Sequence, residues 1–235
     1  MLAAFPITVR SSALKVLTMP LVLHHCHESR SMRSLWLIHE LGLELELKVH
    51  SFGRALRDPA FLAVSPLGRV PCLIDGDLTL FESGAIAEYL CETYDQQQTL
   101  WRAPGQEDRP HWLQWLHYAE TITVHCASLT QQAIAIADPA LRSETVWKLE
   151  SRRLEKAVEV IEQQLAAQDY LLESGFSAAD IGVGYALHVA RLFINLAKFS
   201  RVSEYYQRLS MRPAFQRSLP SPDAPDRIYT QTRYQ

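Results

Sequence analysis

Hydrophobic and polar positions follow two different periods in the first hundred residues. Runs with strand character occupy 20–25, 43–49 and the two halves of 65–81, and helix-like repeats occupy 31–41, 59–64 and 82–94. The residues Asp75-Gly76-Asp77 interrupt the 65–81 run, and glycine supplies the positive φ that a tight hairpin turn needs. The pattern therefore predicts the order βαβαββα, with a parallel pair of strands followed by a β-hairpin.

The strand signal disappears after residue 100. Apolar residues recur at helical spacing over 111–124 and 144–165, while 177–193 is apolar nearly all round, as in a helix at the centre of a bundle. The segment 220–235 contains three prolines and predicts a loose tail or a surface wrap. We therefore predict two domains, a small α/β domain (19–97) followed by an all-helical domain (110–219). A linker (98–109) joins them, an N-terminal extension (1–18) precedes them, and a C-terminal tail (220–235) follows them.

The first eighteen residues stand apart from this pattern. They carry Arg10 and Lys15 but no acidic side chain, which is also the composition of a short transit peptide. They make a poor secretory signal, because no basic residue precedes the apolar part. The first strand-like run begins near Met19, and we therefore favour an extension upstream of a natural start at that methionine.

Composition and charge narrow the function. The chain has 235 residues, of which 48% are hydrophobic and 21% charged, and its net charge of −3 gives no electrostatic reason to expect nucleic acid as a partner. No apolar run reaches the roughly 18 residues that span a bilayer, and no polybasic stretch suggests a membrane surface. The four cysteines form neither a C-x-x-C motif nor a dense disulfide pattern. We expect a cytoplasmic protein that binds a small molecule or another protein.

Three histidines surround one cysteine in the stretch from His24 to His27, an arrangement that invites interpretation as a metal site. Neighbouring side chains of a strand point to opposite faces, so His24 and Cys26 cannot easily share a centre with His25 and His27. Bound zinc needs three or four converging ligands, and we therefore predict no metal here. Cys26 is either a reactive thiol or a small buried hydrophobic residue, and we favour the second interpretation.

Hydroxyl groups follow this stretch directly. Ser29 and Ser31 stand where the first predicted strand turns into a helix, and either one is a suitable helix cap. Taken alone, capping explains both residues without any chemistry.

Two later features make a peptide-binding site plausible. Pro71 opens a strand, and a cis peptide bond at such a corner would leave the Val70 backbone free to pair with an extended peptide. Glu82 and Ser83 precede a helix whose N-terminus offers free N–H groups to an anion, although Ser83 is also an ordinary cap. Together with the hydroxyls near residue 30, these features suit a zwitterionic thiol peptide.

Over residues 20–218 the chain resembles the cytosolic glutathione transferases. The stretch SPLGRVPCLIDGDLTLFESGAIAEYL matches the loop, cis-proline and binding helix of that family, and HHCHESRSMRSLWLIHELGL is most similar to its serine-type members in bacteria and fungi, theta-like or beta-like. The resemblance implies a thioredoxin-like N-terminal domain, a helical C-terminal domain, glutathione as co-substrate without a metal, and a homodimer.

The helical half carries a second part of the resemblance. In FSAADIGVGY, Ser177 and Asp180 fit the N-capping box of the family, and Phe176 with Ile181 fits a hydrophobic staple. We expect a helix to begin at this point.

The resemblance also implies a thiol-activating residue just after the first strand. No tyrosine occurs between Pro20 and Arg33, which disfavours the tyrosine classes. Beta members carry a cysteine where Ser29 stands, and theta members place their active serine four residues before an arginine. Both comparisons select Ser29, with Ser31 as the runner-up. A hydroxyl that donates to sulfur at a helix N-terminus favours the reactive thiolate.

The remaining site residues are likewise those that the resemblance implies. The γ-glutamyl amine and carboxylate fall to Glu82 and Ser83, and the second substrate, a small hydrophobic electrophile or a peroxide, would lie between the domains. Val70, which lies between Arg69 and Pro71, would pair its backbone with the cysteinyl part of glutathione. Arg69 and Arg57 are candidates for binding the glycine carboxylate. The helix expected to lie against the second substrate carries Trp115, Tyr118 and Thr121.

Two other functions remain open at this point. A protein of the same fold that binds without turnover is one, although the intact set of site residues argues against it. A glutathione-dependent thiol-disulfide reductase acting through Cys26 is the other, and it would work without a second cysteine two residues away.

Overall fold

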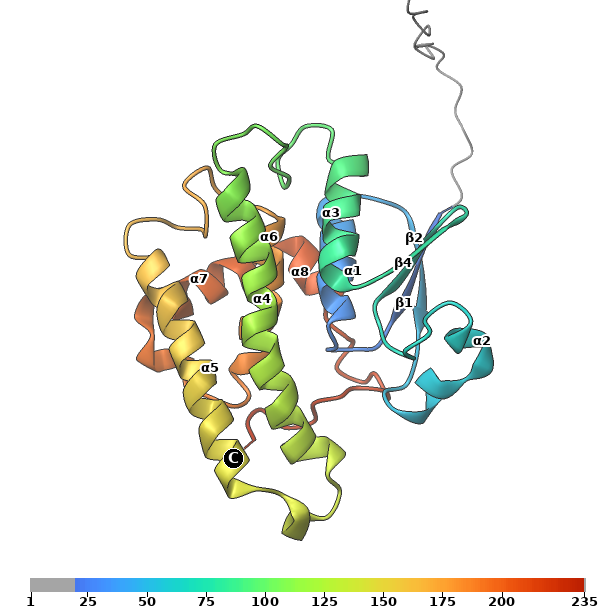
Figure 1. The fold of residues 1–235 in the computed structure, drawn as a ribbon, viewed down its shortest axis with the longest axis vertical. Coiled ribbons are helices and arrows are strands. Elements are labelled where there is room, and N and C mark those ends of the chain that lie inside the picture. Colours follow the sequence, from blue (N-terminus) through green and yellow to red (C-terminus); the bar gives the residue numbers. More distant parts are fainter. Residues whose placement is uncertain (1–19, 235) are drawn as a thin grey trace, which may run out of the picture.

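A mixed four-stranded sheet lies beside a helical half in the computed structural model, which describes residues 20–234 (Figure 1). The expected extension, 1–18, lies outside the described residues. The strand order is β2-β1-β3-β4, with β1 and β2 parallel and both β1–β3 and β3–β4 antiparallel. The prediction of a parallel pair followed by a hairpin is confirmed. The strands are β1 (Leu21–His25), β2 (Leu45–Val49), β3 (Cys72–Asp75) and β4 (Leu78–Phe81).

Local chemistry shapes the corners of the sheet. Gly76 has a φ of 57° in the hairpin that joins β3 to β4, which is the conformation that glycine was expected to supply. The Val70–Pro71 peptide bond is cis, as expected for the corner before β3. The helices of this half are α1 (Ser31–Glu40), the short α2 (Pro59–Leu62) and α3 (Ser83–Tyr94), and α1 and α3 cover one face of the sheet (Figure 1).

Five α-helices form the second half within the described residues. A π-helical turn, Gln131–Ala135, continues the long helix α4. None of the described helices is long and apolar enough to cross a membrane. The capping box is confirmed: the Ser177 hydroxyl accepts from the Ala179 N–H, and the Asp180 carboxylate accepts from the Ser177 N–H at 2.8 Å. The helices are α4 (Arg109–Thr130), α5 (Glu144–Gln164), α6 (Ala178–Ala190), α7 (Ser200–Ser210) and α8 (Pro213–Ser218).

Close packing joins the two halves. Trp36 of α1 is completely buried, and its ring lies so near α6 that a methyl group on Gly184 would come within 3.0 Å of it. Gly182, two residues earlier in α6, packs against α4, where the Ala119 Cβ would lie 3.1 Å from an added methyl group. A single hydrophobic core therefore runs through both halves.

The C-terminal segment, 220–234, is packed rather than loose. Tyr229 and Tyr234 are only 7% and 9% exposed, and the Tyr234 N–H donates to the Leu192 carbonyl at 2.8 Å. The Tyr229 hydroxyl lies 2.9 Å from that of Thr130 at the end of α4. Of the two predicted forms, the structure therefore shows the surface wrap, because tyrosines on the segment bury their rings against the helical half.

Candidate functional site

Ser29 lies in the turn that leads from β1 to α1. Its N–H and its hydroxyl both approach the Cys26 carbonyl, at 3.2 and 2.8 Å. Ser31 is completely buried, and its Oγ accepts from the Cys26 N–H and lies 2.7 Å from both His25 Nδ1 and Ser29 Oγ. Ser29 is partly exposed and lines a cavity, so of the two candidate hydroxyls it is the one that a ligand can reach.

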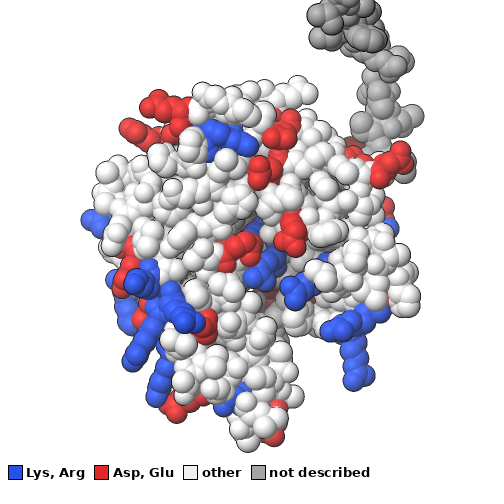
Figure 2. Space-filling view, viewed as in Figure 1, with Lys and Arg blue, Asp and Glu red and all other residues white. Residues whose placement is uncertain are grey.

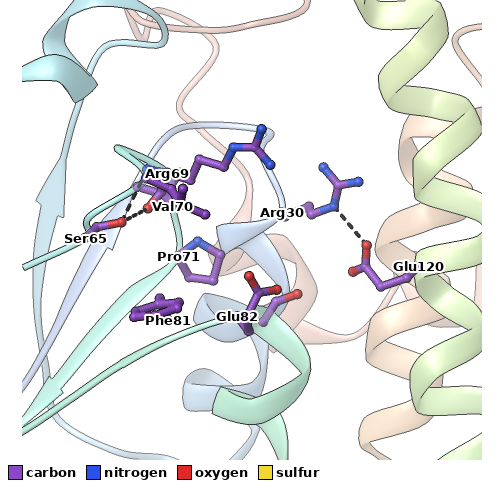
Figure 3. A pocket seen from close by; sticks show the side chains of 10 residues that line it. Arg30, Ser65, Arg69, Val70, Pro71, Phe81, Glu82 and Glu120 are labelled. Atoms are coloured by element: carbon purple, nitrogen blue, oxygen red, sulfur yellow. Dashed lines mark hydrogen bonds and ion pairs between the residues drawn. The ribbon is translucent and has the colours of Figure 1, made fainter. Parts of the chain in front are cut away.

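Two cavities adjoin where the halves of the chain meet. The first has a volume of about 190 Å³ and is shown in Figure 3; the second, of about 410 Å³, begins at Ser29. Arg30, Arg69 and Val70 line both cavities and therefore form their common border. Basic and acidic side chains lie close together in the middle of this face of the molecule (Figure 2).

The start of α3 presents polar groups to the first cavity. Glu82 has a φ of 77° and makes no side-chain cap, and its carboxylate points into the cavity (Figure 3). Ser83 is buried at the first position of the helix, where its Oγ accepts a hydrogen bond from Arg33 at 3.2 Å. The capping role that was an alternative for Ser83 is not seen, and the N-terminus of α3 remains open to an anion.

An ion pair that the sequence did not reveal supports these groups. Arg33 is almost fully buried, pairs with the Glu120 carboxylate of α4, and donates to the Thr123 hydroxyl at 3.0 Å. The Arg30 guanidinium contacts the same carboxylate at 3.2 Å (Figure 3). Burial opposes ionisation of Glu120, but the two arginines outweigh it and lower the pKa of this carboxyl. Glu120 lies 87 residues from Arg33 in sequence, which is why spacing could not link them.

The corner before β3 offers backbone groups to the same cavity. The N–H and C=O of Val70 have no hydrogen-bond partner among the described residues. The backbone of the preceding residue, Arg69, is held by the Ser65 hydroxyl, which donates to the Arg69 carbonyl at 2.7 Å and accepts from the Arg69 N–H at 3.3 Å. Val70 and Pro71 both line the first cavity, beside the start of α3. Arg57, in contrast, lines a separate cavity and is not brought to this site.

The second cavity adjoins a part of α4 that follows the residues expected to contact the second substrate. None of the three expected residues, Trp115, Tyr118 and Thr121, lines this cavity. Trp115 is buried, the Tyr118 hydroxyl donates to the Ala157 carbonyl of α5, and Thr121 is exposed. Helical periodicity indicates which face of α4 is apolar but not where along its axis the other half packs. The mainly apolar wall is formed by residues 123–130 of α4 and by Gln131 after it, together with Phe52, Leu56, Tyr185, Ile228 and Tyr229.

The histidine and cysteine cluster is divided between the two faces of β1. His24 bonds His50 at 2.9 Å, whereas His25 turns towards Ser31. Among the described residues no group of three or more metal-ligating side chains is assembled. Cys26 is completely buried, and burial, aided by Asp226, raises the pKa of its thiol to about 12. A thiol of this kind is not a nucleophile at neutral pH.

Fold and cavities together define a class: a thioredoxin-like α/β domain joined to a helical domain, with a polar cavity beside a larger apolar one. Residues 19–92 match the family model described as Glutathione S-transferase, N-terminal domain, and 146–208 match Glutathione S-transferase, C-terminal domain. Glutathione S-transferase 4 of Zea mays is 31% identical over 195 residues, which cover 77% of this chain and 83% of that protein. The chain therefore belongs to the glutathione S-transferase family of enzymes.

Other relatives agree with this assignment. Glutathione S-transferase 3 of Schizosaccharomyces pombe is 27% identical over 208 residues, which cover 83% of this chain and 84% of that protein. The crystal structure of glutathione transferase URE2P5 from Phanerochaete chrysosporium superposes with a TM-score of 0.74 at 25% identity, covering 85% of this chain and 92% of that one. That of URE2P6 from the same fungus, in complex with oxidized glutathione, gives 0.77 at 23% identity, covering 84% and 94%.

Proposed function

We propose that this protein binds glutathione in the first cavity and activates its thiol through Ser29 for attack on a hydrophobic electrophile or peroxide held in the second. The observation that carries the proposal is the common border of the two cavities at Arg30, Arg69 and Val70, next to Ser29. A thiol placed at this border lies between a polar site for the peptide and an apolar site for its reaction partner.

The charges of the first cavity are complementary to glutathione. In this proposal Glu82 accepts from the γ-glutamyl ammonium group, and the N-terminus of α3 with Ser83 donates to the neighbouring carboxylate; both residues line the first cavity, and the helix start carries no side-chain cap. The cysteinyl part pairs with the free backbone of Val70, and Arg69 neutralises the glycine carboxylate. Several structural neighbours are described in complex with glutathione or with its dinitrobenzene adduct, which supports this ligand.

Thiol activation is assigned to a serine, as in the serine-type members of the family. The Ser29 hydroxyl is accessible, it precedes the N-terminus of α1, and Arg30 adds positive charge at the border of the cavities. A donated hydrogen bond and nearby positive charge both favour the thiolate over the thiol. All four cysteines are free and buried, which fits the proposed cytoplasmic location.

A panel of substrates tests this function. We expect the protein to be retained on immobilised glutathione and to act on a chloronitrobenzene or an organic peroxide, with Cys26→Ser changing these activities less than about twofold because a buried thiol with a raised pKa takes no part. Retention without turnover of any substrate would favour the binding protein. Loss of activity towards a mixed disulfide on Cys26→Ser alone would favour the reductase.

We also propose a homodimer. Leu67 and Phe81, which both line the first cavity, are 67% and 46% exposed, and a partner subunit would remove such side chains from water. Light scattering at micromolar concentration is expected to give about twice the chain mass of 26.7 kDa. A particle of the single-chain mass would contradict this expectation.

A further inference from the structure

A continuous chain of polar groups runs from the cavity into the first half of the protein. Ser29 Oγ lies 2.7 Å from Ser31 Oγ, which in turn lies 2.7 Å from His25 Nδ1 at the end of β1. Ser31 and His25 are both completely buried, so solvent does not compete for these contacts. Only the Ser29 end of the chain faces the cavity. The direction in which the hydroxyl protons point decides whether Ser29 has a proton to offer there.

The far nitrogen of His25 indicates that direction. His25 Nε2 is buried and has no hydrogen-bond partner among the described residues. A buried N–H without an acceptor is more costly than an acceptor without a donor, and we therefore assign the proton of the neutral ring to Nδ1. The ring stays neutral at physiological pH, since burial, with the neighbouring His27, lowers the pKa of His25 to about 3.

With the proton on Nδ1, the shortest contacts set the direction of the remaining bonds. His25 Nδ1–H and the Cys26 N–H both donate to Ser31 Oγ, which occupies its two lone pairs and leaves its proton to donate. That proton goes to Ser29 Oγ at 2.7 Å rather than to the more distant Cys26 carbonyl at 3.3 Å, and Ser29 Oγ also accepts from the Ser31 N–H at 3.3 Å. The Ser29 proton, which lies against the Cys26 carbonyl in this structure, is the only one left to turn towards the cavity.

We infer that His25 is a positioning residue: through Ser31 it orients the Ser29 hydroxyl as a donor towards the glutathione sulfur. The inference rests on the proposed function and specifies how Ser29 performs it. No proton is transferred along the chain; each donor keeps its own, and successive polarisation strengthens the last bond, from Ser29 to the thiolate. A histidine in the opposite tautomer would accept from Ser31, and Ser29 would then give its proton to Ser31 instead.

Substitution of His25 by asparagine or by glutamine tests the two ring nitrogens separately. The amide nitrogen of asparagine takes the place of Nδ1, and that of glutamine takes the place of Nε2. We expect His25→Leu to raise the pKa of bound glutathione by about 0.5 to 1 unit and to lower kcat/KM at pH 7 about three- to tenfold. His25→Asn should restore both, and His25→Gln should not. The KM for glutathione should stay nearly constant, because Glu82 and Ser83 are untouched.

Ser31→Ala interrupts the same chain one step nearer the cavity. It should raise the pKa of the glutathione thiol by a similar amount. The double variant with His25→Leu should lose no more activity than either single variant, because both substitutions interrupt the same hydrogen-bond chain. The measurements are the pH profile of kcat/KM, the ultraviolet absorbance of bound thiolate, and thermal unfolding. Other charges near the turn, Arg30, the Glu28–Arg227 pair and Asp226, are common to all variants.

The outcomes separate the inference from the proposed function. If the wild-type protein does not bind glutathione, the function itself is wrong. If it binds glutathione as a thiolate but His25→Leu leaves the thiol pKa unchanged, or if glutamine restores it and asparagine does not, the orientation by His25 is overturned. A loss that is additive in the double variant would also contradict a single chain.

Discussion

Replacing Ser29 with alanine is expected to lower turnover at pH 7 by about one to three orders of magnitude. One hydrogen bond to a charged group is worth roughly 1.5 to 3 kcal/mol, and losses at comparable donors in enzyme sites run higher. The hydroxyl is the accessible end of the Ser29–Ser31–His25 chain, so its removal leaves the sulfur without that donor. The pKa of bound glutathione should rise, which a pH profile of kcat/KM measures directly.

The shape of that profile distinguishes chemistry from folding. A glutathione thiol whose pKa is raised is less ionised at pH 7, and its thiolate fraction recovers as the pH rises through the new pKa. Activity of the Ser29→Ala protein should therefore be partly restored at high pH, whereas a folding defect should not be. His27→Ala is a matched control on the same turn and should cost little. Full activity in Ser29→Ala together with loss in Ser31→Ala would move the catalytic role to Ser31.

Replacing Glu82 and Ser83 together with alanine is expected to weaken glutathione binding by about two to four orders of magnitude. The change removes a carboxylate that faces the ammonium group and a hydroxyl that faces the carboxylate, each a charge-assisted contact of roughly 1.5 to 3 kcal/mol. Both side chains line the first cavity at the open N-terminus of α3. Calorimetry and retention on immobilised glutathione measure the loss, with kcat at saturating glutathione changing far less.

Single substitutions sharpen this result. Glu82→Gln keeps the size of a residue whose φ of 77° tolerates few changes, and removes only the charge. Ser83→Ala removes the hydroxyl and also leaves the buried Arg33 without one of its acceptors, so thermal unfolding should accompany the binding measurement. Unchanged retention in the double variant would mean that the start of α3 does not hold the peptide.

Local sequence patterns were sufficient to predict the secondary-structure elements and the turn at Ser29, which forms one end of the candidate site. The two-residue hairpin at Gly76, the capping box of Ser177 and Asp180, and the strand-to-helix turn at Ser29 each depend on residues only a few positions apart. Sequence alone could therefore locate them, because backbone preferences and short-range hydrogen bonds decide such features.

Long-range contacts are a different matter, and several parts of the site depend on them. The Arg33–Glu120 pair, which supports Ser83, links residues 87 positions apart. The Glu28 carboxylate, beside Ser29, is held by the N–H of Tyr229 at 3.0 Å, from a segment whose prolines alone suggested a loose tail or a wrap. Neither partner could be identified from spacing.

The sequence by itself determined the order of strands and helices, the turn that carries Ser29, the cis corner at Val70 and the helix start after Glu82, since each follows from neighbouring residues. Which hydroxyl a ligand can reach, and which part of α4 faces the second cavity, were decided only by the tertiary structure. Burial of Ser31 against His25, and the packing of the first half against residues 123–131, depend on how segments far apart in the chain meet. Periodicity specifies a face of an element, but the position of its neighbour comes from close packing of the whole core.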